Sequence, residues 1–138
     1  MAVPSDAGTS AVNPNADDLV AYETLDGGRI ARIWLNRPDA HNAQSRTLLV
    51  QLDEAFGRAE ADDAVRVVIL AARGKNFSAG HDLGSEAAML ERMPGPAQHP
   101  TFRGYGATRE PIAEKTLLQE WHFFFQNTCR WRDLRKIT

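Results

Sequence analysis

The sequence contains one cysteine, Cys129, among its 138 residues. A single thiol cannot close an internal disulfide and has no second thiol with which to hold a metal cluster, which suits a reducing compartment. An excess of one charge sign is also missing, because 16 basic and 18 acidic residues give a formal net charge of −2. No basic field therefore draws the chain to nucleic acid or to an anionic membrane.

Long apolar runs are absent as well. No stretch approaches the roughly 20 apolar residues that a membrane helix needs. The first residues carry Asp6, Asp17 and Asp18 where a signal or transit peptide would be basic. We therefore expect a cytoplasmic protein with no membrane partner and no nucleic-acid partner.

Motifs for nucleotides and metals are missing too. No Gly-x-Gly-x-x-Gly occurs, and Gly74-Lys75 lacks the spacing of a phosphate-cradling loop. His41, His99 and His122 show no metal-ligand spacing, so they are interpreted as loop or helix-surface residues and no metal is expected.

What is present is the composition of one globular domain, with 43% hydrophobic and 25% charged residues. Residues 1–18 are rich in Ala, Pro, Ser, Asn and Asp, so we predict a disordered N-terminal tail and a folded domain over residues 19–138. The final "DLRKIT" stops without a cap or polar tail, and we expect a truncated chain.

The pattern after residue 19 predicts an α/β fold. Two alternating segments, 19–25 and 29–35, flank Asp26-Gly27-Gly28 and predict a hairpin. Ser45 is a candidate N-cap for a helix that ends near residues 61–63. Residues 65–72 are apolar on both faces, which predicts a central strand covered from both sides and parallel to the second strand through a right-handed crossover. The apolar face predicted for the helix comprises Leu48, Leu49, Leu52, Phe56 and Ala59.

The second half is more irregular. A short helix is predicted over residues 85–93, and the Gly- and Pro-rich residues 94–111 predict a long surface loop or lid. Residues 112–134 return to helical spacing with a strongly apolar face, which indicates packing against something large.

The segment "KNFSAGHDL" (residues 75–83) follows the strand predicted to be buried and contains the main candidate functional residues. Ser78, Ala79 and Gly80 have little or no side chain, so another molecule can approach the backbone, and Gly80 can adopt dihedral angles that other residues avoid. If a helix begins just after His81, its N–H groups can receive an oxygen that becomes negative, as one half of an oxyanion hole. Taken alone, the turn is better explained as a tight strand-to-helix connection.

Three segments together carry a resemblance: "IWLNRPDAHNA" (residues 33–43), "VRVVILAARGKNFSAGHDL" (residues 65–83) and "DLRKIT" at the end. In this order and spacing they resemble the enoyl-CoA hydratase/isomerase family. The resemblance covers residues 19–138 and implies a crotonase-like (ClpP/crotonase) α/β fold of the ββα type, which we expect to be truncated here.

The resemblance implies roles for particular residues. The backbone N–H of His81 would bind the thioester carbonyl, and Arg37 would approach a phosphate of coenzyme A unless it is a solvated loop arginine. Coenzyme A belongs to the acyl-CoA substrate, so no separate cofactor is implied. The positions that would hold coenzyme A and the acyl group are Arg37, Asp39, Ala40, His41, Asn42, Ser78, Ala79, Gly80, His81, Asp82 and Leu83.

Asp82 and Glu86 lie about one helical turn apart and could form an acid/base pair. The alternative that we favour is structural, with Asp82 capping the helix that it opens and Glu86 solvated. A contact between Asp82 and the substrate is the less favoured alternative.

The resemblance implies an enoyl-CoA hydratase, a lyase that adds water to a 2-enoyl-CoA through a stabilised enolate, and a homotrimer or hexamer for a full-length form. The glutamates of such hydratases, and the second oxyanion N–H, fall after the strand that "LRKIT" begins. Another crotonase-type enzyme, such as an isomerase, hydrolase or dehalogenase, and a noncatalytic CoA-binding or subunit-binding remnant therefore stay open. The DNA sequence beyond Thr138 would distinguish these three alternatives. We also expect the chain alone to be unstable or to aggregate.

Overall fold

The computed structural model describes residues 18–92, 117 and 119–138. Strands β1 (Val20–Leu25), β2 (Ile30–Leu35) and β3 (Val67–Ala72) form one sheet in the order β1-β2-β3. β1 pairs antiparallel with β2 across a short 3₁₀ turn (Asp26–Gly28), and β2 pairs parallel with β3. The predicted α/β class, hairpin and parallel pairing are therefore confirmed.

Helix α1 (Arg46–Ala61) connects the two parallel strands and covers one face of the sheet. The Ser45 hydroxyl accepts a hydrogen bond from the Leu48 amide at 3.3 Å, so the predicted N-cap is confirmed. The helix ends at Ala61, within the predicted region. Its buried apolar side chains are those that the spacing predicted, together with Ala55: Leu48, Leu49, Leu52, Phe56 and Ala59.

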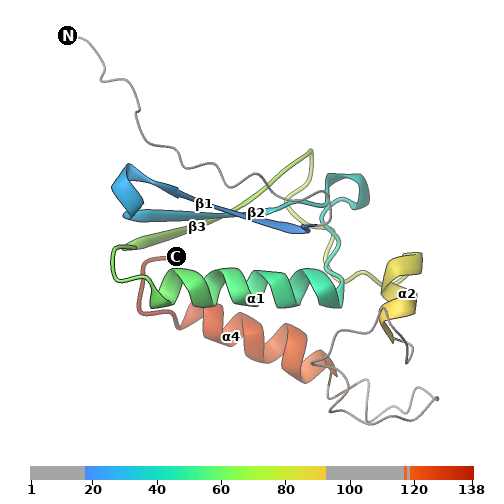
Figure 1. Cartoon of the computed structure of the whole chain (residues 1–138). Helices are drawn as coiled ribbons and strands as arrows, with labels where there is room; N and C mark the ends of the chain where they lie inside the picture. The colour runs from blue at the N-terminus through green and yellow to red at the C-terminus, as the bar shows by residue number, and fades with distance from the viewer. Residues whose placement is uncertain (1–17, 93–116, 118) are drawn as a thin grey trace.

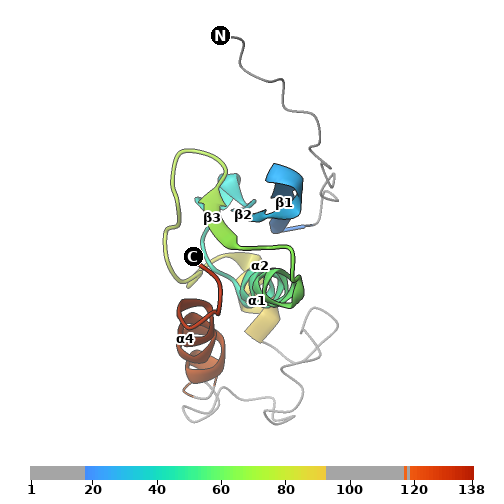
Figure 2. The ribbon, with the colours of Figure 1, turned by 90° about the vertical axis from the view of Figure 1, so that its left-hand side faces the viewer.

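The described elements stack in three layers (Figure 1). The sheet lies on α1, and α1 lies on the C-terminal helix, which runs through a π-helical segment (η4, Glu120–Gln126) into α4 (Asn127–Arg132); the end view in Figure 2 shows the same order. Phe123 is fully buried and packs with Leu49, and the Trp131 ring stacks on Phe56 at 5.2 Å between centroids. The outer layer is therefore fixed to α1 by aromatic packing.

The expectation that β3 is covered on both faces is wrong for the described chain. Val68 packs in the core between the sheet and α1, whereas Ile69 on the opposite face is 40% exposed. β3 is the last strand of the described sheet, and one end of its outer edge is hydrogen-bonded to the C-terminal residues. The Val68 amide donates to the Ile137 carbonyl at 2.8 Å, in an isolated parallel bridge between Val67 and Ile137. The C-terminal residues thus lie where a next parallel strand would begin, as the sequence predicted.

Helix α2 (Glu86–Arg92) confirms the short helix after the His81 loop. The predicted N-terminal tail falls outside the described residues except for Asp18, and so do the predicted 94–111 loop and most of the first part of the 112–134 helix. In the described part of the chain, no helix combines the length and apolar character that crossing a bilayer requires.

Candidate functional site

The two loops that follow β2 and β3 are joined by backbone hydrogen bonds. The first loop contains a 3₁₀ turn (η2, Pro38–Ala40) and the second contains the small residues of the motif. The Ala79 amide donates to the His41 carbonyl at 3.0 Å, and the Ser78 hydroxyl donates to the Asn42 carbonyl at 2.9 Å. Because β2 and β3 are parallel, their carboxyl ends meet at one edge of the sheet, where α/β proteins bind ligands.

Asn42 connects these two loops from inside the protein. Its side chain is fully buried, and its amide group donates to the carbonyls of Arg73 and Asn76, each at 2.8 Å. Its side-chain oxygen accepts from the Arg37 amide at 2.9 Å. Asn42 has a positive φ of 53°, a conformation that Asn tolerates better than most residues. Its side-chain hydrogen bonds hold the two loops together, and the coenzyme A contact predicted for this position stays a prediction.

His81 lies in an extended bridge beside Gln44. The Gln44 amide donates to the Gly80 carbonyl at 2.7 Å, and the Asp82 amide donates to the Gln44 carbonyl at 3.0 Å. Successive peptide groups of an extended chain point in opposite directions, so the His81 N–H points away from Gln44. Within the described residues, no acceptor binds this N–H. Gly80 has a φ of 84°, which confirms the conformational freedom expected of it.

The condition that a helix begins just after His81 is not met, because α2 begins at Glu86, one residue after the start predicted for the short helix. The residues in between form a turn held by Asp82, whose carboxylate accepts from the Ser85 amide at 3.0 Å and from the Ser85 hydroxyl at 2.6 Å. The Ser85 hydroxyl in turn accepts from the Ala88 amide at 3.1 Å and therefore caps the helix. Asp82 supports the cap instead of providing it, and the helix dipole does not act at His81. Glu86 is exposed, as predicted.

Arg37 is turned inward and forms an ion pair with Asp82. Its guanidinium also donates to the Ala43 carbonyl at 3.0 Å and to the Ser85 hydroxyl at 3.2 Å. Only 16% of this side chain is exposed, so the alternative of a solvated loop arginine is wrong. The guanidinium joins the first loop to the start of α2.

The environment of Asp82 keeps it ionised. Burial is the largest single influence on this carboxyl and opposes ionisation, but the hydrogen bonds from Ser85 and Arg37 together outweigh it and lower the pKa to about 2. A carboxyl with this pKa carries no proton to donate at neutral pH. Its side chain is 5% exposed. These contacts favour the structural interpretation of Asp82 over a role as acid or base.

The remaining predicted residues form the outer surface of the two loops. Asp39, His41 and Ala79 are exposed, Ala40, Ser78 and Gly80 are partly exposed, and Leu83 is 71% exposed. They are thus accessible to a ligand at the carboxyl edge of the sheet.

The His81 imidazole contacts the C-terminal helix. Its Nε2 lies 3.1 Å from Glu120 Oε2, and its ring stacks on Phe124 with 3.6 Å between centroids and 13° between planes. The sequence analysis assigned no role to Glu120. No local pattern relates residues 39 positions apart, so only the tertiary fold reveals this pair.

Glu91 was also missed. It is buried in α2, and its carboxylate accepts from the amides of Arg46 at 3.0 Å and Thr47 at 3.3 Å, in the first turn of α1. A carboxylate at a helix N-terminus satisfies amides that have no partner within the helix and interacts favourably with the helix dipole. Glu91 therefore couples α2, and with it the His81 loop, to α1.

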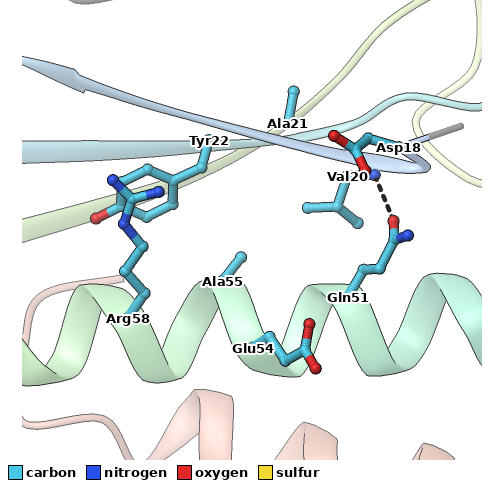
Figure 3. A pocket seen from close by; sticks show the side chains of 8 residues that line it. All are labelled: Asp18, Val20, Ala21, Tyr22, Gln51, Glu54, Ala55 and Arg58. Carbon is cyan, nitrogen blue, oxygen red and sulfur yellow. Dashed lines mark hydrogen bonds between the residues drawn. The ribbon is translucent and has the colours of Figure 1, made fainter. Parts of the chain in front are cut away.

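A separate cavity lies between β1 and α1 (Figure 3). It has a volume of about 320 Å³, and the Arg58 guanidinium lies over the Tyr22 ring at 4.1 Å beside it. Burial raises the pKa of the Tyr22 hydroxyl. None of the predicted site residues borders this cavity, so its size does not make it the functional site. Its lining comprises Asp18, Val20, Ala21, Tyr22, Gln51, Glu54, Ala55 and Arg58.

Fold and site together define an α/β protein with a small-residue loop, and a backbone N–H without an acceptor among the described residues, at the carboxyl edge of a parallel strand pair. Residues 26–107, more than half of the chain, match the sequence model of the family described as enoyl-CoA hydratase/isomerase. The chain belongs to the enoyl-CoA hydratase/isomerase family, and its fold is the crotonase fold.

Relatives agree with this assignment. The chain is 57% identical over 125 residues to EchA13 of Mycobacterium tuberculosis, a proposed enoyl-CoA hydratase, covering 91% of this chain and 39% of that protein. A crystal structure of a probable enoyl-CoA hydratase from Mycobacterium smegmatis superposes with a TM-score of 0.64 at 36% identity, over 86% of this chain and 38% of that one. A 4-chlorobenzoyl coenzyme A dehalogenase of an Arthrobacter species is 42% identical over 72 residues, which cover 52% of this chain and 25% of that protein. The chain thus spans about two fifths of the length of the first two relatives.

Proposed function

We propose that this chain supplies the thioester-binding part of an enoyl-CoA hydratase, which adds water to a 2-enoyl-CoA. The backbone N–H of His81 donates to the thioester oxygen as negative charge develops on it. The exposed surface of the two loops, around Asp39, His41 and Ala79, receives the coenzyme A part of the substrate.

The observation that carries this proposal is the direction of one peptide group. The neighbouring peptide groups, at the Gly80 carbonyl and the Asp82 amide, are bonded to Gln44, which orients the His81 N–H outward from the bridge. The loop that holds it is fixed by Asn42 and by the Arg37 ion pair with Asp82. A donor held in place before the reaction needs no reorganisation when charge develops, which is why such donors stabilise enolates effectively.

A second reaction is supported by a specific relative. Part of the chain is 42% identical to a 4-chlorobenzoyl coenzyme A dehalogenase. Polarising the thioester carbonyl serves dehalogenation as well as hydration. The His81 N–H is therefore assigned to the shared step, and hydration is proposed because the more extensive matches are named as hydratases. A cytoplasmic location and assembly into trimers or hexamers are proposed on the resemblance and the composition alone.

The test is the polarisation of a bound thioester. Crotonyl-CoA labelled with ¹³C at the carbonyl is titrated with the chain, and a downfield shift of the carbonyl signal reports donation to its oxygen. His81→Pro removes the amide N–H, and we expect it to abolish the shift and to weaken enolate stabilisation by about 2.7 to 4 kcal/mol. His81→Ala keeps the N–H and is expected to keep the shift.

The control for folding is coenzyme A without an acyl group. His81→Pro should bind it as the unchanged chain does, because the nucleotide contacts a different surface of the loops. An unshifted carbonyl in the unchanged chain, or the same shift in His81→Pro, contradicts the proposed function.

A further inference from the structure

We propose that the His81 imidazole, oriented by Glu120, is a proton acceptor for the α-hydrogen of the bound acyl-CoA. This inference rests on the proposed function and adds a second role for the same residue. The backbone of His81 would stabilise the enolate, and its side chain would carry the proton.

The imidazole is held in one orientation by two contacts. Nε2 bonds to the Glu120 carboxylate at 3.1 Å, and the ring lies flat on Phe124 at 3.6 Å. The carboxylate accepts a hydrogen bond from the Nε2–H. The hydrogen bond made by one ring nitrogen sets the tautomer, so the lone pair lies on Nδ1. Within the described residues, nothing is bonded to Nδ1.

The helix that provides both contacts is in an uncommon conformation at this point. Glu120 and Phe124 belong to the π-helical segment Glu120–Gln126, and both reach the same imidazole. π-Helical turns are rare and occur frequently at functional sites. The local winding places a carboxylate and an aromatic ring together on the face toward the His81 loop.

Two other carboxylates near the ring are engaged elsewhere. Asp82 is paired with Arg37 and Ser85, and Glu91 binds the first amides of α1. Glu120 is therefore the carboxylate that the described structure places on the imidazole. The ring and Glu120 border a small hollow that is also lined by Gln44, Ser45, Arg46, Asp82, Ala88, Glu91 and Phe124.

The pair is accessible to a ligand. The His81 side chain is 45% exposed and that of Glu120 is 40% exposed. A thioester whose oxygen accepts from the His81 N–H has its α-carbon two bonds from that oxygen. The imidazole extends from the Cα next to that N–H, and the proposal places its Nδ1 at the α-hydrogens.

The proton-transfer step balances without a further reactant. The α-C–H bond breaks, its electron pair moves into the enolate, and the proton passes to Nδ1 to give an imidazolium ion. Glu120 stabilises this cation, and the enolate oxygen is held by the His81 N–H. Return of a solvent-exchanged hydrogen from Nδ1 to the α-carbon regenerates the thioester.

The experiment measures exchange of the α-hydrogens of butyryl-CoA in D₂O by proton NMR, with ¹³C-carbonyl polarisation recorded on the same samples. We expect the unchanged chain to exchange them above the buffer rate. His81→Ala should lower exchange by at least about 100-fold while it keeps the polarised carbonyl. Added imidazole should restore part of the exchange, which a merely structural role would not produce. Glu120→Gln should give an intermediate loss that Glu120→Asp partly reverses.

His122→Ala is the matched control, since it removes an imidazole of the same helix that bonds to Gln126 and contacts Phe123. It should exchange as the unchanged chain does. A polarised carbonyl without exchange, or with equal exchange in His81→Ala, overturns the proton-acceptor role and leaves the proposed function intact. Absence of both polarisation and exchange in the unchanged chain overturns both proposals.

Discussion

Two neighbouring residues of the same loop lie in opposite environments. Asp82 points inward to Arg37 and Ser85, with 5% of its side chain exposed, whereas His81 points outward to Glu120, with 45% exposed. Both bond to side chains distant in the sequence, Asp82 in an ion pair with Arg37 and His81 in a hydrogen bond with Glu120. The difference teaches that the inner pair determines where the loop lies, and the outer pair is available for a ligand.

The largest effect is expected from breaking the inner pair. Asp82→Ala leaves the largely buried guanidinium of Arg37 without its anion and leaves the Ser85 amide without its acceptor. We expect the free energy of unfolding to fall by about 3 kcal/mol, measured by urea denaturation followed by circular dichroism.

The double variant Arg37→Met/Asp82→Leu is the control for this prediction. It leaves neither charge without its partner. Its loss of unfolding free energy should therefore be smaller than the sum of the losses in Arg37→Met and Asp82→Leu. Additive losses would show that the two side chains do not interact.

The next largest effect is expected at Asn42, whose buried side chain connects the two loops. Asn42→Ala leaves the carbonyls of Arg73 and Asn76 without their donor and places alanine at a positive φ. We expect a loss of about 2 to 3 kcal/mol in the same urea experiment. Asp39→Ala, in the exposed part of the first loop, is the control and should change stability by less than about 0.5 kcal/mol. Equal losses in the two variants would contradict the role assigned to Asn42.

Acid should reproduce part of the first effect without a mutation. The pKa of Asp82 falls from 3.8 to about 2 on folding, so the folded state binds this proton less readily than the unfolded state does. Its stabilising contribution is complete above pH 4 and is lost as the pH falls toward 2. The loss should stay below the ~3 kcal/mol expected for Asp82→Ala.

Urea midpoints measured between pH 5 and pH 2.5 test this prediction. Glu23, whose pKa is lowered by hydrogen bonds from Arg32 and Trp34, adds to the acid sensitivity of the chain. Asp82→Asn should therefore flatten the dependence without abolishing it. An identical slope in Asp82→Asn would exclude Asp82 as a source.

The same contrast explains what the sequence could predict. Local patterns predicted the hairpin, the N-cap at Ser45 and the apolar face of α1, because each depends on residues close together in the chain. The position of His81 after the strand β3 was also predicted. The cap of α2 was assigned to the wrong residue, since nothing local distinguishes an Asp82 that caps from one that supports a cap at Ser85.

Contacts between distant segments were beyond the sequence. The inward turn of Arg37 and the contacts of Glu91 and Glu120 join residues 39 or more positions apart, and no periodic spacing encodes them. The exposed second face of β3 was missed for a related reason, because an apolar strand looks the same whether its cover lies within the described residues or not.

The smallest effect is expected from breaking the outer pair. Glu120→Gln removes one charge from a contact whose two side chains are 45% and 40% exposed, where water already screens the attraction. The unfolding free energy should change by less than about 1 kcal/mol, against about 3 kcal/mol for the inner pair. The difference is measured with the same urea protocol at pH 7 and repeated at 0.5 M salt, which should reduce the small effect further. If Glu120→Gln destabilised the chain as much as Asp82→Ala, the contact between His81 and Glu120 would have a structural role. It would then not support a role of the His81 ring in proton transfer.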